Sequence, residues 1–320
     1  MRVLVVGGAG YIGAHVCEEL VNAGYDVRIY DDFSNGLHSR ITKFPDVVTA
    51  DVLDRESLVK AMAGVDSVIH LAAKKAVGES VDNPLKYYEN NFGGTLNILA
   101  AMKIAGVKKI VFSSTAAVYS PSEKPAITEE DSTIPLSPYG ATKLLSEQLI
   151  SNVSSAEGFS CVSLRYFNVA GSGSDEMGDN SRDNLVPKVF LAITNGERPE
   201  VFGTDYPTPD GTCIRDYIHV SDLARAHIDA LKAVEKSRID EIYNVGSGNG
   251  FSVTEVMTEI EKAMGKNLNP ILGPRRAGDS PKLIASIEKI SRDLGWKPKH
   301  TLRDMITSSW SAWQSQGGSR

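Results

Sequence analysis

Short runs of apolar, often β-branched residues alternate with amphipathic segments through the first half of the chain. The apolar runs predict strands at 3–6, 27–30, 47–50, 67–71, 109–112 and 161–164. Apolar spacings of three and four predict helices at 11–23, 55–63, 84–105 and 139–153. This alternation indicates an α/β fold, in which a Rossmann-like, doubly wound parallel sheet carries helices on both faces.

The pattern changes beyond about residue 170. The segment 171–184 is rich in Gly, Ser, Asp and Asn and predicts a loop, and shorter elements follow it. A chain of 320 residues is long enough for two domains. We expect a Rossmann domain over 1–168, with a later segment at about 212–245 returning to it. Residues 169–320 would form mainly a smaller mixed α/β domain that recognises the substrate.

Composition and charge narrow the class of protein. Hydrophobic residues make up 42% of the chain and the formal net charge is −6, so nothing indicates a nucleic-acid partner. No apolar run approaches the roughly 18–20 residues that a membrane span needs, and the first run is too short for a signal peptide. We therefore expect a cytoplasmic protein with no membrane partner. Three widely spaced cysteines predict neither a disulfide framework nor a metal site: Cys17, Cys161 and Cys213.

A glycine-rich turn follows the first predicted strand and opens the first predicted helix. Gly7, Gly10 and Gly13 fit a G-x-x-G-x-x-G spacing. Such glycines permit a tight turn, so that a pyrophosphate can approach the positive end of the helix. Glycines that merely shape a turn are the alternative, but the strand–turn–helix context favours a dinucleotide site.

An acidic pair ends the second predicted strand. Asp31 comes 18 residues after Gly13, close to the spacing of about 20 for the residue that bonds the ribose hydroxyls of a dinucleotide. A carboxylate there, with Asp32 beside it, would repel the 2′-phosphate of NADP. The pair therefore favours NAD as the cofactor, and a solvated loop charge is the alternative.

A second motif begins the predicted helix at 139–153. Ser137 is a predicted N-cap, and Tyr139 and Lys143 are four residues apart on one helix face. A nearby ammonium lowers the pKa of a phenol, and the phenolate can then remove a hydroxyl proton while hydride leaves the same carbon for NAD. Taken alone, a Y-x-x-x-K spacing on a helix is common and mostly incidental.

A hydroxyl cluster makes this pair more informative. Ser113, Ser114 and Thr115 follow the strand predicted at 109–112, and ligands of parallel sheets bind beyond the carboxyl ends of the strands. Thr115 would orient a substrate hydroxyl beside Tyr139. An ordinary turn residue is the alternative interpretation of Thr115.

These motifs together resemble the extended short-chain dehydrogenase/reductase superfamily and, within it, the UDP-glucose 4-epimerase (UDP-galactose 4-epimerase) family. The matching segments cover nearly the whole chain: GGAGYIGAH (7–15), HLAAKKAVGES (70–80), YYENNFGGTL (87–96), FSSTAAVY (112–119), SPYGATKLLSE (137–147), LRYFN (164–168), FGTDYPTPDGTCIRDYIHV (202–220), YNVGSG (243–248) and RRAGD (275–279).

The resemblance implies a role for each matching position. Tyr139 would be the proton acceptor, Lys143 its electrostatic partner, and Thr115 the hydroxyl at the sugar O4. It implies NAD contacts at Gly7, Gly10, Tyr11, Ile12, Gly13, Asp31, Asp32, Phe33, Ser34, Asn35, Gly36, Asp51, Val52, Leu71, Ala72, Ala73, Lys74, Lys75, Asn90, Ser113, Tyr139, Lys143 and Phe167. It implies nucleotide-sugar contacts at Thr115, Asn168, Asn184, Leu185, Val201, Phe202, Arg215, Arg276 and Asp279.

Plainer interpretations of some of these positions stay open at this point. Leu185, Val201 and Phe202 are equally typical of a hydrophobic core. Arg215 and Arg276 are equally typical of surface cations, although the paired N–H groups of a guanidinium also suit a diphosphate.

The activity that the resemblance implies is reversible epimerisation at C4 of a UDP-hexose through a 4-keto sugar, with NAD staying bound. Three alternatives share the motifs: a 4,6-dehydratase, a plain or decarboxylating dehydrogenase, and a non-catalytic NAD sensor. Dehydration needs an acid pair after Thr115, where the chain has Ala116 and Ala117.

The resemblance also implies a homodimer formed by the helices at 84–105 and 139–153. The resemblance places Leu283 about where the size of the side chain controls access of N-acetylated sugars. Leucine is of intermediate size, so the sequence does not decide whether UDP-N-acetylhexosamines are substrates.

Overall fold

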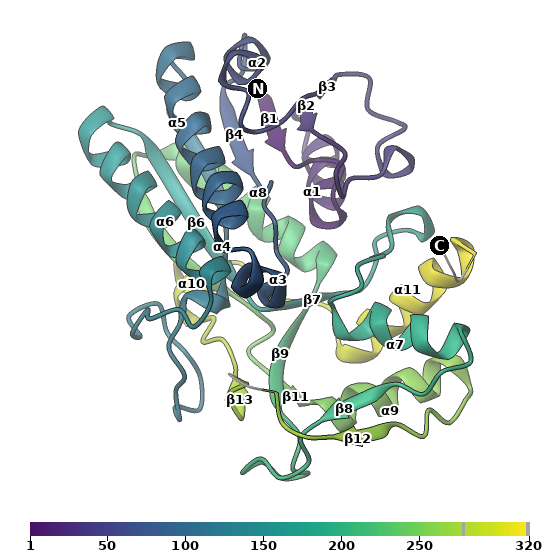
Figure 1. Ribbon diagram of the computed structural model, residues 1–320. Helices are drawn as coiled ribbons and strands as arrows, with labels where there is room; N and C mark the ends of the chain where they lie inside the picture. The colour runs from purple at the N-terminus through teal and green to yellow at the C-terminus, as the bar shows by residue number, and fades with distance from the viewer. Residues whose placement is uncertain (277–278, 318–320) are drawn as a thin grey trace.

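The largest element of the computed structural model, which describes residues 1–276 and 279–317, is a parallel sheet of seven strands (Figure 1). All its neighbouring strands pair in parallel. From edge to edge the strands are β10 (Asp240–Val245), β6 (Ser160–Tyr166), β5 (Lys109–Thr115), β4 (Ser67–His70), β1 (Arg2–Val6), β2 (Asp26–Asp31) and β3 (Val47–Thr49). The predicted Rossmann-like α/β fold is thus confirmed.

Helices cover both faces of this sheet because successive strand residues point to opposite sides. In β1, Val3 and Val5 pack in one hydrophobic cluster with residues of α1 and α8. Leu4 and Val6 pack in the other cluster, with residues of α2, α5 and α6. The helix bounds are α1 (Tyr11–Asn22), α8 (Val220–Lys236), α2 (Arg55–Ala61), α5 (Gly94–Ala105) and α6 (Pro138–Glu157).

A smaller group of elements lies beside the carboxyl edge of the large sheet (Figure 1). Its strands are β7 (Asn168–Ala170), β9 (Ile214–His219), β11 (Gly250–Ser252) and β13 (Lys282–Leu283) in one sheet, and β8 (Glu200–Phe202) with β12 (Ile271–Gly273) in another. Its helices are α7 (Leu185–Thr194), α9 (Val253–Met264), α11 (Leu302–Ser315) and the short η4 (Asp175–Met177). The predicted domain boundary after residue 168 stays a prediction: β9 lies in the smaller sheet, whereas α10 (Glu288–Leu294) packs on β10.

The segment predicted as one helix over 84–105 is divided in the structure. It consists of α4 (Pro84–Tyr87), the π-helix η2 (Tyr88–Gly93) and α5, and a short α3 (Val77–Asp82) precedes it. Hydrophobic periodicity continues through a π-turn, so the division is not visible in the pattern. π-turns are frequent at functional sites, and this one carries Asn90 and the buried Asn91.

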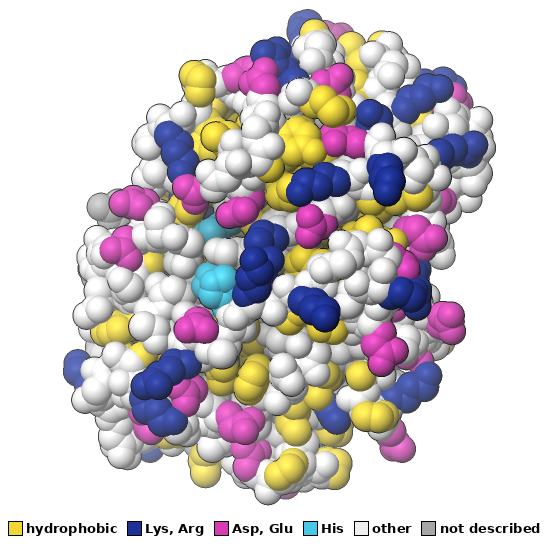
Figure 2. Space-filling model, turned by 180° about the vertical axis from the view of Figure 1, so that it is seen from behind, with side chains coloured by type: hydrophobic (Ala, Val, Ile, Leu, Met, Phe, Trp, Pro, Cys, Tyr) yellow, Lys and Arg dark blue, Asp and Glu magenta, His cyan; other side chains and the backbone are white. Residues whose placement is uncertain are grey.

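Acidic and basic side chains are mixed over the face seen from behind in Figure 2, with apolar side chains scattered among them. This mixture accords with the small net charge of −6. In the described part of the chain, no helix is both long enough and apolar enough to cross a membrane.

Candidate active site

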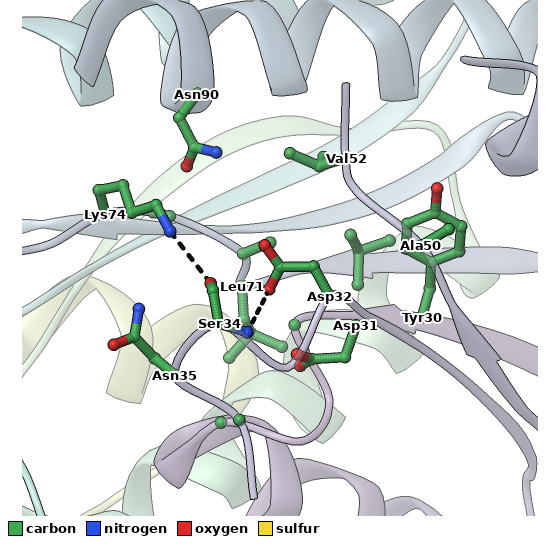
Figure 3. Close-up of a pocket in the computed structure, with 16 residues that line it drawn as sticks. Tyr30, Asp31, Asp32, Ser34, Asn35, Ala50, Val52, Leu71, Lys74 and Asn90 are labelled. Atoms are coloured by element: carbon green, nitrogen blue, oxygen red, sulfur yellow. Dashed lines mark hydrogen bonds between the residues drawn. The ribbon is translucent and has the colours of Figure 1, made fainter. Parts of the chain in front are cut away.

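A pocket opens near the carboxyl ends of β1, β2 and β4 (Figure 3). Most of its wall consists of positions that the sequence predicted for the cofactor: Gly7, Gly10, Asp31, Asp32, Ser34, Asn35, Gly36, Val52, Leu71, Ala72, Ala73 and Asn90. Lys74, within the predicted range 71–75, also lines it, and three further residues were not predicted: Val6, Tyr30 and Ala50.

The glycine turn brings the backbone of the pocket unusually close together. Gly7 has a left-handed φ of +87°, and a Cβ at this position would lie 2.6 Å from the backbone nitrogen of Ala72. Gly10 is the N-cap of α1 and makes no side-chain bond to the first helical turn. The N–H groups of that turn, which includes Gly13, therefore lie at a helix end suited to a pyrophosphate.

Asp31 is fixed at the end of β2 by two backbone amides. Its Oδ2 accepts from Ala9 N at 2.9 Å and its Oδ1 accepts from Phe33 N at 2.8 Å. Burial raises the pKa of Asp31, and these two hydrogen bonds oppose that rise. Since each carboxylate oxygen can accept a second bond, Asp31 keeps acceptor capacity toward the pocket that it lines. Asp32 lies next to it and accepts from Ser34 N at 2.9 Å.

Of the two predicted lysines, Lys74 lines the pocket and Lys75 does not. Lys74 Nζ donates to Ser34 Oγ at 3.0 Å (Figure 3), whereas Lys75 is exposed outside the wall. Adjacent residues in an extended segment point in opposite directions, so only one of the two lysines can face a ligand. The motif shows that a lysine is present but does not show which one faces inward.

Tyr30 was not predicted, because it precedes the acidic pair on which the prediction rested. Its hydroxyl donates to the Asp51 carbonyl oxygen at 2.7 Å. The bond fixes the turn after β3 that carries Asp51 and Val52. The aromatic residue at the end of the strand predicted over 27–30 is the signal that could have identified this position.

Other predicted cofactor positions lie outside the wall of this pocket: Tyr11, Ile12, Gly13, Phe33, Asp51, Lys75, Ser113 and Phe167. Tyr11 donates its hydroxyl to the Gly171 carbonyl oxygen at 2.5 Å. Phe167 is buried in a hydrophobic cluster with Ala116 and Tyr119, and Ser113 lies near the end of β5, two residues before Thr115. These last two positions therefore lie with the second part of the site.

The residues present fit NAD. A close-packed glycine turn at a helix N-terminus suits a pyrophosphate, and two carboxylates at the end of β2 suit ribose hydroxyls while repelling a 2′-phosphate. Val52 and Leu71 add apolar surface to the wall.

The second part of the site begins at the N-terminus of α6. Ser137 Oγ accepts from Gly140 N at 3.1 Å, so Ser137 is the N-cap that the sequence predicted, and Pro138 occupies the first helical position. A Cβ on Gly140 would lie 2.3 Å from the Ala117 carbonyl oxygen. Glycine thus lets α6 approach the short helix η3 (Ala116–Val118) that follows Thr115.

The structure brings Thr115, Tyr139 and Lys143 together, all buried. Burial raises the pKa of Tyr139, and a side-chain interaction with Thr115 opposes that rise. Lys143 Nζ donates to the Ser113 carbonyl oxygen at 2.8 Å and lies 4.7 Å from the centroid of the Phe112 ring. Burial lowers the pKa of Lys143 to about 7, against the charge of Glu147. The Lys143 ammonium can therefore lose its proton near neutral pH.

A cationic cluster lies where β8, β9 and the segment before β13 meet. An Arg215 guanidinium nitrogen is 3.0 Å from Asp279 Oδ1, and Arg215 also donates to the Ser280 carbonyl oxygen at 2.8 Å. The Arg276 guanidinium carbon lies 3.8 Å from the centroid of the Phe202 ring. Cationic forks beside an aromatic face suit a nucleoside diphosphate. Residues 277 and 278 of the RRAGD segment lie outside the described residues.

The remaining predicted sugar positions have mixed surroundings. Asn168 starts β7 and is exposed. Asn184 is the N-cap of α7 and donates to Asp179 Oδ2 at 2.6 Å, and Leu185 begins that helix. Val201 is 3% exposed and packs in a hydrophobic core, which matches the plainer interpretation of this position.

Comparison with known proteins places this site in a family. The model of the NAD dependent epimerase/dehydratase family matches residues 3–246. UDP-glucose 4-epimerases of Bacillus subtilis and Azospirillum brasilense are 43% and 44% identical, covering 98% of this chain and 97% and 92% of the relatives.

Solved structures agree with the sequence relatives. A UDP-glucose 4-epimerase of Stenotrophomonas maltophila, with bound NAD and formylated UDP-arabinopyranose, superposes with a TM-score of 0.95 at 38% identity, over 99% of this chain and 98% of that one. The Bifidobacterium longum UDP-glucose 4-epimerase, in complex with NAD+ and UDP, gives 0.91 at 40% identity over 99% of both chains. The resemblance predicted from sequence is confirmed, and the chain belongs to the NAD dependent epimerase/dehydratase family.

Proposed function

We propose that this enzyme catalyses the reversible, NAD-dependent epimerisation of a UDP-hexose at C4, interconverting UDP-galactose and UDP-glucose. The observation that carries the proposal is the buried set of Thr115, Tyr139 and Lys143 at the carboxyl end of β5. Relatives at 43–44% identity named UDP-glucose 4-epimerase support it.

Each member of the set has a chemical role. Tyr139 removes the proton of the sugar O4 and returns a proton to O4 when C4 is reduced on its other face, so it acts as base and then as acid. The Lys143 cation lowers the pKa of that phenol, and Thr115 bonds the O4 hydroxyl. Bound NAD supplies a transient hydride acceptor for C4, so the carbon passes through a ketone without net oxidation.

The nucleotide and the hexose must be bound with different firmness during this cycle. Inversion at C4 requires the keto sugar to present its other face, while the intermediate must not escape. Arg215 and Arg276 would hold the diphosphate through charge-assisted hydrogen bonds, with Phe202 beside them. A firmly held nucleotide and a loosely held hexose satisfy both needs.

The chain lacks the residues that dehydration of the same substrates requires. Elimination of water needs an acid pair directly after the strand-end threonine, and Ala116 and Ala117 stand there in η3. Their methyl groups cannot transfer a proton. Epimerisation needs no group beyond the set already described.

The decisive experiment follows the conversion of UDP-galactose to UDP-glucose by purified protein with no added NAD. Product formation without net NADH supports epimerisation. Stoichiometric NADH release would identify a dehydrogenase, and cofactor binding without turnover a sensor. Tyr139→Phe should lower turnover by about 10²–10⁴-fold, in the range expected for loss of a general acid–base group. Tyr88→Phe, on the partly exposed η2, is the matched control.

The same helices that flank the site support a homodimer. Leu85 on α4 is 76% exposed and Ile104 on α5 is 65% exposed, although both are large apolar side chains. Covering them with the same face of a second copy would remove this apolar surface from water. Sedimentation of the wild type as a dimer, and of Ile104→Glu as a monomer, would support this assembly; a monomeric wild type would contradict it.

A cytoplasmic location is also part of the proposal. The three cysteines are buried and unbridged in the structure, as is usual where thiols stay reduced. Fractionation of the producing cells would test it.

A further inference from the structure

An ion pair lies inside the protein one turn of α6 beyond Lys143. Arg165 Nη2 is 2.7 Å from Glu147 Oε2, and the two side chains are only 4% and 3% exposed. Arg165 Nε also donates to Glu147 Oε1 at 3.0 Å, and Ser114 Oγ donates to the same oxygen. A buried pair of this kind often contributes little net stability, because both charges lose their hydration. Net stability alone therefore does not explain why this ion pair lies next to Lys143.

The pair is tied to the reacting groups from two sides. Glu147 follows Lys143 by four residues, so the two side chains lie on one face of α6. Ser114, which bonds Glu147, stands between Ser113, whose carbonyl accepts from Lys143, and Thr115. The carboxylate is thus fixed next to the cation that the proposed chemistry uses.

The other titratable groups around Lys143 cannot take the place of this carboxylate. His70 on β4 is buried, and desolvation together with the Lys143 charge lowers its pKa well below the usual value, so it stays neutral. Tyr139 lies on the same helix, and Tyr166 on β6 lies next to Tyr139; burial raises the pKa of both phenols. Arg165 is already paired with Glu147. In the described residues, Glu147 is the carboxylate that acts on Lys143.

We propose that Glu147 is a positioning residue that keeps Lys143 in its cationic form, and that Arg165 and Ser114 fix the carboxylate for this task. Through Lys143 the carboxylate also favours the ionised Tyr139. The inference rests on the proposed function, since it assigns Glu147 a role only through these two groups.

The test is the pH profile of kcat/KM for UDP-galactose, measured with the NAD-loaded enzyme. In Glu147→Gln the Lys143 cation loses its partner, so the alkaline limb should move about one pH unit lower, with a roughly tenfold loss at pH 8. Glu147→Asp keeps the charge and should keep much of the wild-type profile. A wild-type profile in Glu147→Gln overturns the inference.

Two further variants separate charge from structure. Glu147→Gln combined with Arg165→Met removes the pair as a unit, which avoids an unpaired buried cation. This double variant should still show the lowered alkaline limb; a return to the wild-type profile would assign the effect to Arg165 and overturn the inference. Glu157→Gln removes a charge from the far end of α6, where it pairs with the exposed Lys103, and should leave the profile unchanged.

Lys143→Met distinguishes this inference from the proposed function. If Lys143→Met is as active as wild type, the proposed chemistry fails. If it is inactive while Glu147→Gln matches wild type, only the role of Glu147 fails.

Discussion

Lys143 Nζ donates a hydrogen bond of 2.8 Å to the Ser113 carbonyl oxygen, which joins helix α6 to the end of strand β5. The lysine is 2% exposed, so few alternative positions are open to its ammonium group. The sheet thereby fixes the cation beside Tyr139. This arrangement explains how a flexible side chain can act at a defined place.

Lys143→Met should therefore do more than remove one charge. Without the cation the pKa of Tyr139 rises, so the acidic limb of the pH–rate profile should move to higher pH. We expect a loss of roughly 10²–10⁴-fold in kcat near pH 7.5, with partial recovery at higher pH. Steady-state kinetics from pH 6 to 10 measure both effects. Lys103→Met, an exposed lysine on α5, should behave as wild type.

The parts of the fold that local patterns determine could be predicted from the sequence. Strand β1 and helix α1 have their own periodicity, and the glycine turn between them requires that order. Tyr139 and Lys143 could be paired because a helix places residues four apart on one face. Thr115 could be added because strand ends of a parallel sheet share one edge.

Features that depend on distant partners could not be predicted in this way. The π-turn at η2 leaves the apolar periodicity intact; there, Asn91 Oδ1 accepts from Lys74 N at 2.8 Å, a contact between separate segments. The choice of Lys74 over Lys75 depends on how the chain leaves β4. The pairing of Glu147 with Arg165 joins a helix to a strand, and neither residue looks unusual in its own segment.

Asp31→Asn should weaken the retention of NAD. The carboxylate accepts from Ala9 N and Phe33 N through different oxygens, and an amide offers only one acceptor oxygen. The side chain would therefore lose a turn-fixing bond as well as the charge suited to ribose hydroxyls. We expect about a tenfold higher Kd for NAD, which corresponds to a loss of about 1.4 kcal/mol in binding free energy. Titration of cofactor-free protein measures it, and Asp26→Asn at the exposed start of β2 is the control.

Arg215→Met should act on substrate binding more than on chemistry. Removing a charge-assisted contact to a diphosphate costs about 1.5–3 kcal/mol, so the KM for UDP-galactose should rise about 10- to 100-fold. The value of kcat should change much less, because the guanidinium is assigned to the diphosphate and takes no part in the proton transfer. Arg215→Lys keeps the charge but loses the fork, and should fall between the two. An unchanged affinity for UDP, measured by calorimetry, would remove Arg215 from the site.

The surroundings of His15 predict that the free energy of unfolding falls in acid. His15 is 2% exposed, its Nδ1 lies 2.8 Å from the Tyr11 carbonyl oxygen, and its Nε2 accepts from Gly173 N at 2.8 Å. Nδ1 therefore carries the proton, and a second proton on Nε2 would face the Gly173 N–H group. Burial lowers the pKa of His15 from 6.5 to about 4, so the neutral ring is the form that the fold accepts.

The sign of the pH effect follows from this lowered pKa. Below pH 6.5, His15 binds a proton in the unfolded chain but not in the folded protein. Stability that is present above pH 6.5 is therefore lost as the pH falls toward 4. The loss due to His15 should be about 2 kcal/mol at pH 5 relative to pH 7.5. Urea denaturation of wild type and His15→Gln at these two pH values measures it: the variant should be less stable at pH 7.5 and should show the smaller fall. Exposed His38→Gln should follow wild type, and equal falls in wild type and His15→Gln would contradict the assignment.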